Sequence, residues 1–259
     1  MERELSSEFK NAKGLNKYWG TEHPKHLGRM LDYLRSTGYQ GPASWRDPAY
    51  LGFVRPIDND LFVKVILHSF GELEPGGFCF DTEIHICSNV VFDIERDLEL
   101  WEQALLPPEV VSNAPVSLWV VDLSHLKWNC VPGKNPIWQL NDSNRIEESG
   151  ADGWIEDWKK YGEPYIDAIR SADYAATELL NIPAYKPNAW VKSDGPATPA
   201  AYEYSAILLV ETGRVGDAIN VLKGLEVSLL ELSQRQELRR SEELLLERVR
   251  KLMRWAKLK

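Results

Sequence analysis

The sequence predicts an α+β fold, with an antiparallel sheet of about four strands packed with helices and followed by an all-helical C-terminal extension. In Leu61–His68 and Phe78–Ser88, apolar and polar residues alternate, so each segment has one apolar and one polar face. Such one-sided strands are typical of antiparallel sheets. From Gly153 onward the apolar residues recur at spacings of three and four, which predicts helices instead.

The N-terminal half begins with a predicted helix over residues 22–36, for which Thr21 is a candidate cap and Gly38 a stop. Apolar runs bounded by turn residues then predict strands at Leu51–Arg55, Leu61–His68, Phe78–Val91 and Val116–Leu123, with a short one at Ile137–Leu140. Residues 57–60 have turn chemistry, so we expect the first two strands to form a hairpin. Residues 93–105 are expected to be helical or irregular.

In the C-terminal half, the helical pattern that starts at Gly153 contains Gly162 and Pro164, which should bend it. Further helices are predicted at Ala172–Leu180, Ala200–Glu211, Val215–Leu222 and about Val227–Leu258. A proline-rich segment follows the first of these helices and indicates a linker. The predicted organisation is therefore an α+β domain over residues 1–182, a linker over 183–199 and a helical region over 200–259.

The composition indicates a folded protein made in the cytosol, with no membrane association. Aromatic residues make up 10% of the 259 residues, and no apolar run approaches the length of a membrane span, about 18 residues. The N-terminus is polar rather than signal-like, and the three cysteines have no paired spacing that would predict a disulfide framework. We therefore expect a cytoplasmic protein with reduced thiols.

Negative charge is concentrated in the first part of the chain. Residues 1–182 carry a formal charge of −12 and residues 183–259 one of +3, and much of the excess lies between Phe70 and Val110. Such a region repels nucleic acid and attracts basic surfaces, although ordinary solubility also explains an acidic surface. The candidate contacts for a basic protein partner are Glu72, Glu74, Asp93, Glu95, Asp97, Glu99 and two tryptophans in polar sequence, Trp128 and Trp138. Trp154 and Trp158 fit a helical core instead.

The order of these features supports a family comparison. An N-terminal helix is followed by Gly52-Phe53-Val54-Arg55, then by a meander that contains Ile84-His85-Ile86, and then by a helical block with Trp154, Tyr161-Gly162 and Ile166. Over about residues 20–182 this pattern resembles a family of uncharacterised bacterial α+β domains, some of which lie near toxin–immunity loci. The resemblance implies an α+β fold and an immunity or protein-binding role, and it implies no chemistry.

The C-terminal region has a second resemblance. Its small and apolar residues have spacings similar to those of one tetratricopeptide repeat: Ala206, Gly213, Ala218, Leu222 and Leu225. A single unit cannot bury both of its faces, so we expect a helical hairpin near residues 200–227 that packs on its surroundings. A peptide-binding scaffold is the alternative interpretation.

The polar face of the strand at Phe78–Ser88 is a candidate for chemistry. It carries Cys79, Asp81, Glu83, His85 and Cys87, and His68 could join it from the neighbouring strand. His68, Cys79, His85 and Cys87 are weak candidates for metal ligands, and His68, Asp81, Glu83 and His85 for a hydrolytic or metal-dependent site. No Cys-x-x-Cys, His-Glu-x-x-His, nucleophile-elbow or phosphate-loop motif accompanies them, so no cofactor is predicted. Buried cysteines and a hydrogen-bonded histidine are the alternative.

The last predicted helix is basic and amphipathic. Residues Ser233–Lys259 carry nine Lys and Arg against four Glu, with an apolar stripe that includes Leu244, Val249 and Leu252. This pattern fits a helix packed on the core, a dimerising coiled coil, or a contact with membrane or nucleic acid. A contact between this basic helix and the acidic first part of the same chain also fits.

Together these features favour a non-enzymatic protein-binding module of the immunity type, which occludes a basic partner such as a toxin domain. An enzyme on the polar sheet face and a helical scaffold remain the alternatives.

Overall fold

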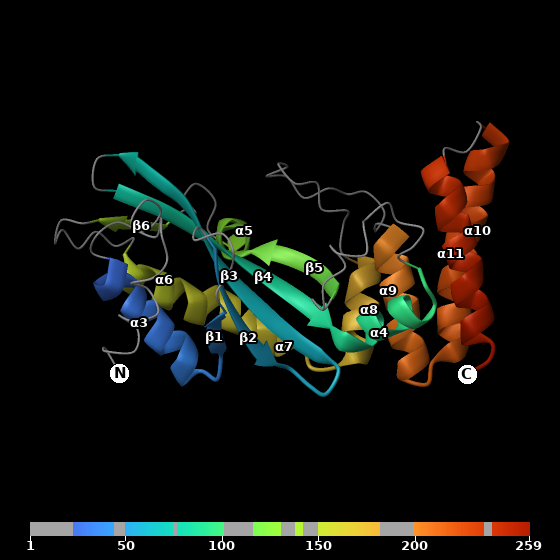
Figure 1. Ribbon diagram of the computed structural model, residues 1–259, viewed down its shortest axis with the longest axis horizontal. Helices are drawn as coiled ribbons and strands as arrows, with labels where there is room; N and C mark the ends of the chain where they lie inside the picture. The colour runs from blue at the N-terminus through green and yellow to red at the C-terminus, as the bar shows by residue number, and fades with distance from the viewer. Residues whose placement is uncertain are drawn as a thin grey trace. The chain divides into compact units, whose positions relative to one another are not determined.

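The computed structural model describes residues 23–43, 50–74, 77–100, 116–130, 138–141, 150–181, 199–235 and 240–259. Its strands form one sheet, and helices pack beside it or form a separate group, so the predicted α+β class is confirmed (Figure 1). No described helix has both the length and the apolar character that crossing a membrane requires.

The sheet contains all the predicted strands and one short strand that was not predicted. The strands are β1 (Gln40–Ala43), β2 (Tyr50–Pro56), β3 (Leu61–Glu74), β4 (Gly77–Ser88), β5 (Val116–Asp122) and β6 (Trp138–Asn141). The order is β1-β2-β3-β4-β5, and β6 also pairs with β4. β2 and β3 are antiparallel, with Tyr50 opposite His68 and Leu51 opposite Leu67. The missed strand β1 is four residues long and contains a proline, so it has no detectable alternation.

The turn between β2 and β3 forms as predicted. The Asp58 carboxylate accepts hydrogen bonds from the backbone N–H groups of Asp60, at 2.8 Å, and Leu61, at 2.7 Å. The backbone N–H of Ile57 donates to the Leu61 carbonyl at 2.9 Å and closes the turn. Aspartate favours turns because its short side chain can satisfy backbone donors in this way.

The prediction that the β4 segment runs to Val91 is wrong, because the strand ends at Ser88 and a helix begins there. The Ser88 hydroxyl accepts a hydrogen bond from the backbone N–H of Val91 at 3.1 Å and caps α4 (Asn89–Asp97). A serine cap satisfies an N–H group that would otherwise lack a partner at the helix start. The apolar residues after Ser88 therefore belong to a helix rather than to the strand.

One face of the sheet forms a buried core. The inward side chains of β2, β3 and β4 are Leu51, Phe53, Val63, Val65, Leu67, Phe80, Thr82, Ile84 and Ile86. Trp154 covers this face and donates its indole N–H to the Thr82 hydroxyl at 2.8 Å. It also stacks on Trp158, with ring centroids 5.3 Å apart. Both tryptophans are fully buried, which confirms that they belong to the core.

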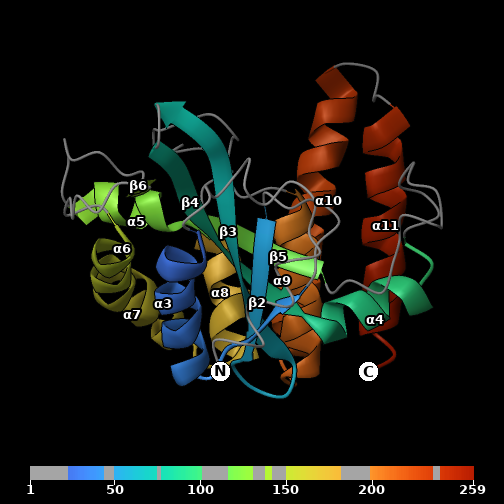
Figure 2. The same ribbon diagram turned by 60° about the vertical axis from the view of Figure 1, so that its left-hand side comes forward.

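The helices beside the sheet are α3 (His23–Ser36), α5 (Leu123–Cys130), α6 (Ala151–Asp157), η1 (Trp158–Gly162) and α7 (Glu163–Ala168). Figures 1 and 2 show α3 beside α6, and α3 buries Met30, Leu31 and Leu34. Where the sequence predicted a bend, the chain takes one π-helical turn, η1. Gly162 ends this turn directly against the Trp158 ring, where a Cβ atom would lie 2.8 Å from a ring carbon.

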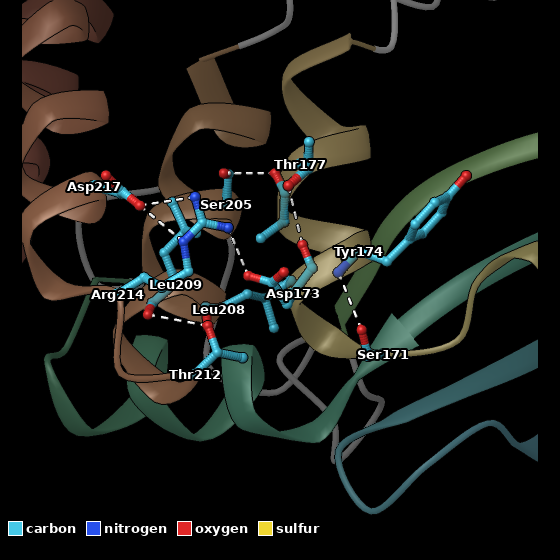
Figure 3. A network of polar contacts seen from close by, with 11 residues as sticks. Ser171, Asp173, Tyr174, Thr177, Ser205, Leu208, Leu209, Thr212, Arg214 and Asp217 are labelled. Carbon is cyan, nitrogen blue, oxygen red and sulfur yellow. Dashed lines mark hydrogen bonds and ion pairs between the residues drawn. The ribbon is translucent and has the colours of Figure 1, made fainter.

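The remaining helices are α4, α8 (Ala172–Asn181), α9 (Pro199–Glu211), α10 (Val215–Arg235) and α11 (Arg240–Ala256). α9 packs against α8, α10 and α11, and α10 and α11 lie side by side (Figure 2). The Ser205 hydroxyl donates to the Ala176 carbonyl at 2.7 Å, and the Arg214 guanidinium pairs with Asp173 and Asp217, at 2.7 Å each (Figure 3). These contacts join α8 to α9 and to the start of α10.

Two helices, α9 and α10, pack side by side where the sequence predicts a hairpin, but the second helix runs past the predicted end of that hairpin near residue 227. Gly213 has a φ of +82° where α9 ends, and Ala206, Ala218 and Leu222 are buried. The structure replaces the predicted helices Val215–Leu222 and Val227–Leu258 with α10 and α11. α10 continues through Gly224 because glycine keeps its backbone hydrogen bonds in a helix, unlike proline.

Contacts divide the chain into two compact units. The sheet unit contains residues 1–56, 62–86 and 120–168, and the helical unit contains residues 57–61, 87–119 and 169–259. The predicted linker, residues 183–199, lies outside the described residues except for its last residue, Pro199, which begins α9.

Replacing Gly162 with alanine should destabilise the protein by about 1–3 kcal/mol, because the new Cβ must displace the buried Trp158 ring. The matched change Gly224→Ala, in the middle of α10 with no atom near the new Cβ, should stabilise by about 1 kcal/mol. Urea unfolding of both variants measures this difference. Equal effects of the two changes would contradict the tight contact at η1.

Candidate functional site

The acidic helix α4 is the first candidate surface. It lies within the region of highest negative charge, and the structure divides its acidic residues between two sides. Glu95 points inward and is 3% exposed, whereas Asp93 and Asp97 are exposed. Glu99, just beyond the helix, is also exposed and has a φ of +49°. Residues two apart lie on opposite sides of a helix and residues four apart on the same side, which explains the division.

Glu95 belongs to a buried ion-pair network centred on Arg248 of α11. Arg248 Nη2 lies 3.0 Å from Glu95 Oε1 and 2.9 Å from Glu203 Oε2, and Arg248 Nε lies 3.1 Å from Glu203 Oε1. Arg248 Nη1 also reaches the Leu100 carbonyl at 3.5 Å. One guanidinium therefore joins α4, α9 and α11. This is the predicted contact between the basic last helix and the acidic part of the chain.

The network contains two carboxylates for one cation. Burial raises the pKa of Glu203, which is 2% exposed, and the neighbouring Glu95 carboxylate raises it further. The guanidinium of Arg248 opposes both effects, but burial outweighs it and the pKa of Glu203 stays above its ordinary value. Buried charges of this kind need both a partner and hydrogen bonds to persist, and Arg248 supplies both.

The outer side of α4 is exposed and has only weak internal pairing. Arg96 lies 2.9 Å from Asp93 and 3.2 Å from Asp97, and all three side chains are more than half exposed. Exposed pairs of this kind contribute little to stability because water screens them. The outer side of α4 therefore keeps a net negative charge.

Two of the predicted partner contacts are corrected by the structure. Glu95 is buried against Arg248, as described above, and Trp138 is only 1% exposed. Trp138 donates its indole N–H to Asp157 Oδ2 at 2.9 Å. Its polar atom is therefore satisfied inside the protein rather than by solvent or a partner. The side chains of Glu72, Glu74 and Trp128 lie outside the described part of the structure. The exposed residues that remain are Asp93, Asp97 and Glu99.

The polar face of the sheet is the second candidate surface. The β2–β3 register places Tyr50 opposite His68 and Val54 opposite Lys64, so these four residues share the face that points away from the buried core. His85 Nε2 lies 2.9 Å from Glu83 Oε2. This hydrogen bond, together with the charges of His85, His68 and Lys64, lowers the pKa of Glu83 and outweighs the opposing effect of burial.

Asp81 on the same strand has the opposite electrostatic environment. Its carboxylate accepts hydrogen bonds from the Ser124 hydroxyl and, at 2.6 Å, from the backbone N–H of Thr82. Burial nevertheless raises the pKa of Asp81 to about 7, and the nearby Asp122 adds to the increase. The pKa values of Asp81 and Glu83, two residues apart, are thus shifted in opposite directions. Such opposed shifts are common at functional sites.

The structure does not assemble the predicted metal ligands. Cys79 and Cys87 are both buried and outside any disulfide, and Cys87 Sγ lies 3.7 Å from the Ser117 hydroxyl. Among the described residues, no group of three His, Cys, Asp or Glu side chains has a geometry that could hold a metal ion. The alternative interpretation, buried cysteines with a hydrogen-bonded histidine, agrees with these positions.

Sequence reasoning missed Glu203, Arg248 and Ser124. Glu203 had a detectable signal, because it is the one charged residue between Pro199 and Val210 in a mostly apolar helix, and such a charge needs a buried partner. Nothing in the sequence identifies Arg248 as that partner, since 45 residues separate the two.

Comparisons with protein-family models, curated proteins and solved structures found no match to this chain.

Removing the central cation should be far more costly than removing one of its anions. We expect Arg248→Met to destabilise the protein by about 3–5 kcal/mol, because two buried carboxylates then lose their cation. Glu203→Gln should cost about 1 kcal/mol or less, because glutamine can still accept a hydrogen bond from Arg248 and the excess negative charge is gone. Urea unfolding at pH 7 tests this order, and equal losses would contradict it.

Asp81 and Glu83 should contribute to stability with opposite pH dependence. Because folding raises the pKa of Asp81 from 3.8 to about 7, its ionisation reduces stability as the pH rises through that range, by up to about 4 kcal/mol. Asp81→Asn should remove this loss. Folding lowers the pKa of Glu83, so its contribution is present above the ordinary pKa of 4.5 and is lost as the pH falls. Unfolding of Asp81→Asn and Glu83→Gln between pH 3 and 9 measures both slopes, and slopes of the same sign would refute the assignment.

Proposed function

We propose that this chain is a non-enzymatic protein-binding module of the immunity type, which occludes a basic protein partner through the outer side of α4. The observation that carries the proposal is the division of acidic residues on α4. Glu95 anchors the helix to Arg248, while Asp93, Asp97 and Glu99 remain exposed. The resemblance over residues 20–182 is a second, sequence-level support for the same role.

The anchoring favours binding because it fixes the helix before a partner arrives. A helix held by a buried network loses little conformational freedom on association, so more of the interaction energy appears as affinity. Arg248 and Glu203 hold α4 from α11 and α9, and the Ser88 cap fixes its first turn. The three outer carboxylates then keep a defined spacing that a basic surface can match.

Electrostatic attraction is the expected mechanism of recognition. A negatively charged helix raises the rate of encounter with a basic protein and disfavours acidic partners. It also disfavours nucleic acid, whose phosphates it repels. Salt screens such attraction over about 8–10 Å, so the affinity should fall as the salt concentration rises.

The alternative functions have less support. The apolar residues of the α9–α10 hairpin, including Ala206, Ala218 and Leu222, are buried by packing, which leaves less of that hairpin for a peptide. On the sheet face, Asp81 is engaged by Ser124 and Thr82, and Glu83 by His85. A hydrolytic role for His68, Asp81, Glu83 and His85 would therefore require these hydrogen bonds to be exchanged.

The test is a charge reversal with a matched control. The α4 variant carries Asp93→Lys, Asp97→Lys and Glu99→Lys, and the control carries the same change at three exposed acidic residues of α10 and α11, Glu231, Glu243 and Glu247. Wild type and both variants are used to capture partners from lysate of the native organism, with quantitative mass spectrometry and washes at low and high salt.

We expect wild type and control to capture the same basic protein, released by salt, and the α4 variant to lose at least about tenfold in affinity for it. Capture of the same protein by all three forms, with the same salt dependence, would show that α4 is not the binding surface. Loss of binding by the control as well would assign the effect to net charge rather than to α4, and would also refute the proposal.

A further inference from the structure

The exposed side of α11 carries a line of charged residues. The apolar side of this helix is already used within the chain, where α11 packs on α9 and α10 and buries Leu246, Val249, Leu252, Met253 and Ala256 (Figure 1). A coiled coil with another chain cannot use that side as well. Five exposed side chains recur at spacings of four and three residues, and we call them the α11 stripe: Glu243, Glu247, Arg250, Arg254 and Lys257. Alternating spacings of four and three keep side chains in one line along a helix.

The sign of the charge changes at the middle of the α11 stripe. Its first two residues are acidic and its last three are basic. Arg250 has a partner in its own chain, because its Nε lies 2.7 Å from Glu226 Oε1 of α10. Within the described part of the chain, the side chains of the other four residues form no ion pair. The stripe therefore presents two unpaired negative charges followed by two unpaired positive charges.

This order of charges is complementary to a second copy of the stripe that runs in the opposite direction. Glu243 lies seven residues before Arg250 and Lys257 seven residues after it, while Glu247 lies three before and Arg254 four after. A two-fold axis at Arg250 therefore places Glu243 opposite Lys257 of the second copy. It places Glu247 within about 1.5 Å, along the helix axis, of the level of Arg254 of the second copy. Each pair occurs twice, because a two-fold contact is reciprocal.

The centre of such a contact also avoids a conflict of charge. The two Arg250 side chains lie nearest the axis, and each is bound to Glu226 of its own chain, whose side chain is 22% exposed. Leu230 lies one turn after Glu226 on the same side of α10 and is 36% exposed. The surface beside the stripe thus adds an apolar contact to the ion pairs.

We propose that this chain forms a two-fold dimer in which two α11 stripes pair in antiparallel orientation. A uniformly acidic or basic partner would be attracted by one half of the stripe and repelled by the other, whereas a second copy is attracted by both halves. Parallel pairing would place like charges together. Because exposed ion pairs each contribute little and are screened by salt, the dimer is weak and salt-dependent. The stripe shares no residue with the partner surface proposed for α4, so the two proposals are independent.

Sedimentation equilibrium of the full chain, from micromolar to millimolar concentration, tests the proposal. We expect a dimer at low salt, with a dissociation constant that rises at least about tenfold at about 1 M salt, where the screening length is about 3 Å. One variant combines Glu243→Lys with Glu247→Lys, and another combines Arg254→Glu with Lys257→Glu. Each alone should weaken the dimer at least about tenfold, because like charges then face each other. An equal mixture of the two variants should form a dimer at least as tight as that of wild type, since the opposite charges are restored.

The matched control combines Asp93→Lys with Asp97→Lys, which makes the same change in net charge as the first variant but on the exposed side of α4. It should dimerise as wild type does. A monomer at every concentration at low salt would overturn the proposal and assign the charge order of α11 to the helix dipole alone. Failure of the mixed variants to associate would also overturn it, as would equal weakening in the α4 control. Retained capture of a basic partner by the Arg254→Glu and Lys257→Glu variant would show that the proposed α4 surface does not depend on this dimer.

Discussion

Three helices of the helical unit meet at the buried guanidinium of Arg248. Glu95 comes from α4 and Glu203 from α9, and both carboxylates lie within hydrogen-bond distance of this one side chain from α11. Burying two carboxylates without a cation beside them would be strongly unfavourable. The position of α4, and with it the exposed acidic surface, therefore depends on an interaction at the opposite side of the helix.

The sheet unit depends on a different constraint, the complete burial of one face. Trp154 and Trp158 cover the inward residues of the sheet, and Gly162 permits the close approach of the chain to Trp158. Because that face is committed to the core, the polar residues that alternate with it must lie on the other face. The stacked rings of Tyr50 and His68 and the exposed ring of Phe70 lie on that other face as a consequence of this alternation.

The fold was largely predictable because strand and helix patterns are local. The alternation of apolar and polar residues located β3 and the start of β4. The end of β4 was harder to predict, because Ser88 could either continue the strand or cap a helix, and the local sequence is compatible with both conformations. The site was less predictable. Glu95 and Trp138 have ordinary polar neighbours in the sequence, and their burial results from partners distant along the chain, Arg248 and Asp157. Contacts between residues far apart in the chain produce no regular spacing in the sequence from which they could be predicted.

Hydrogen exchange of the α4 backbone amides in wild type and Glu95→Ala tests most directly whether Arg248 holds the acidic helix in place. The variant keeps the pair between Arg248 and Glu203, so the rest of the helical unit should stay folded. If Arg248 holds α4 through Glu95, amides of α4 should exchange at least about tenfold faster in the variant, while those of α9, α10 and α11 keep their protection. Unchanged exchange in α4 would contradict it, because the helix would then be held by other contacts.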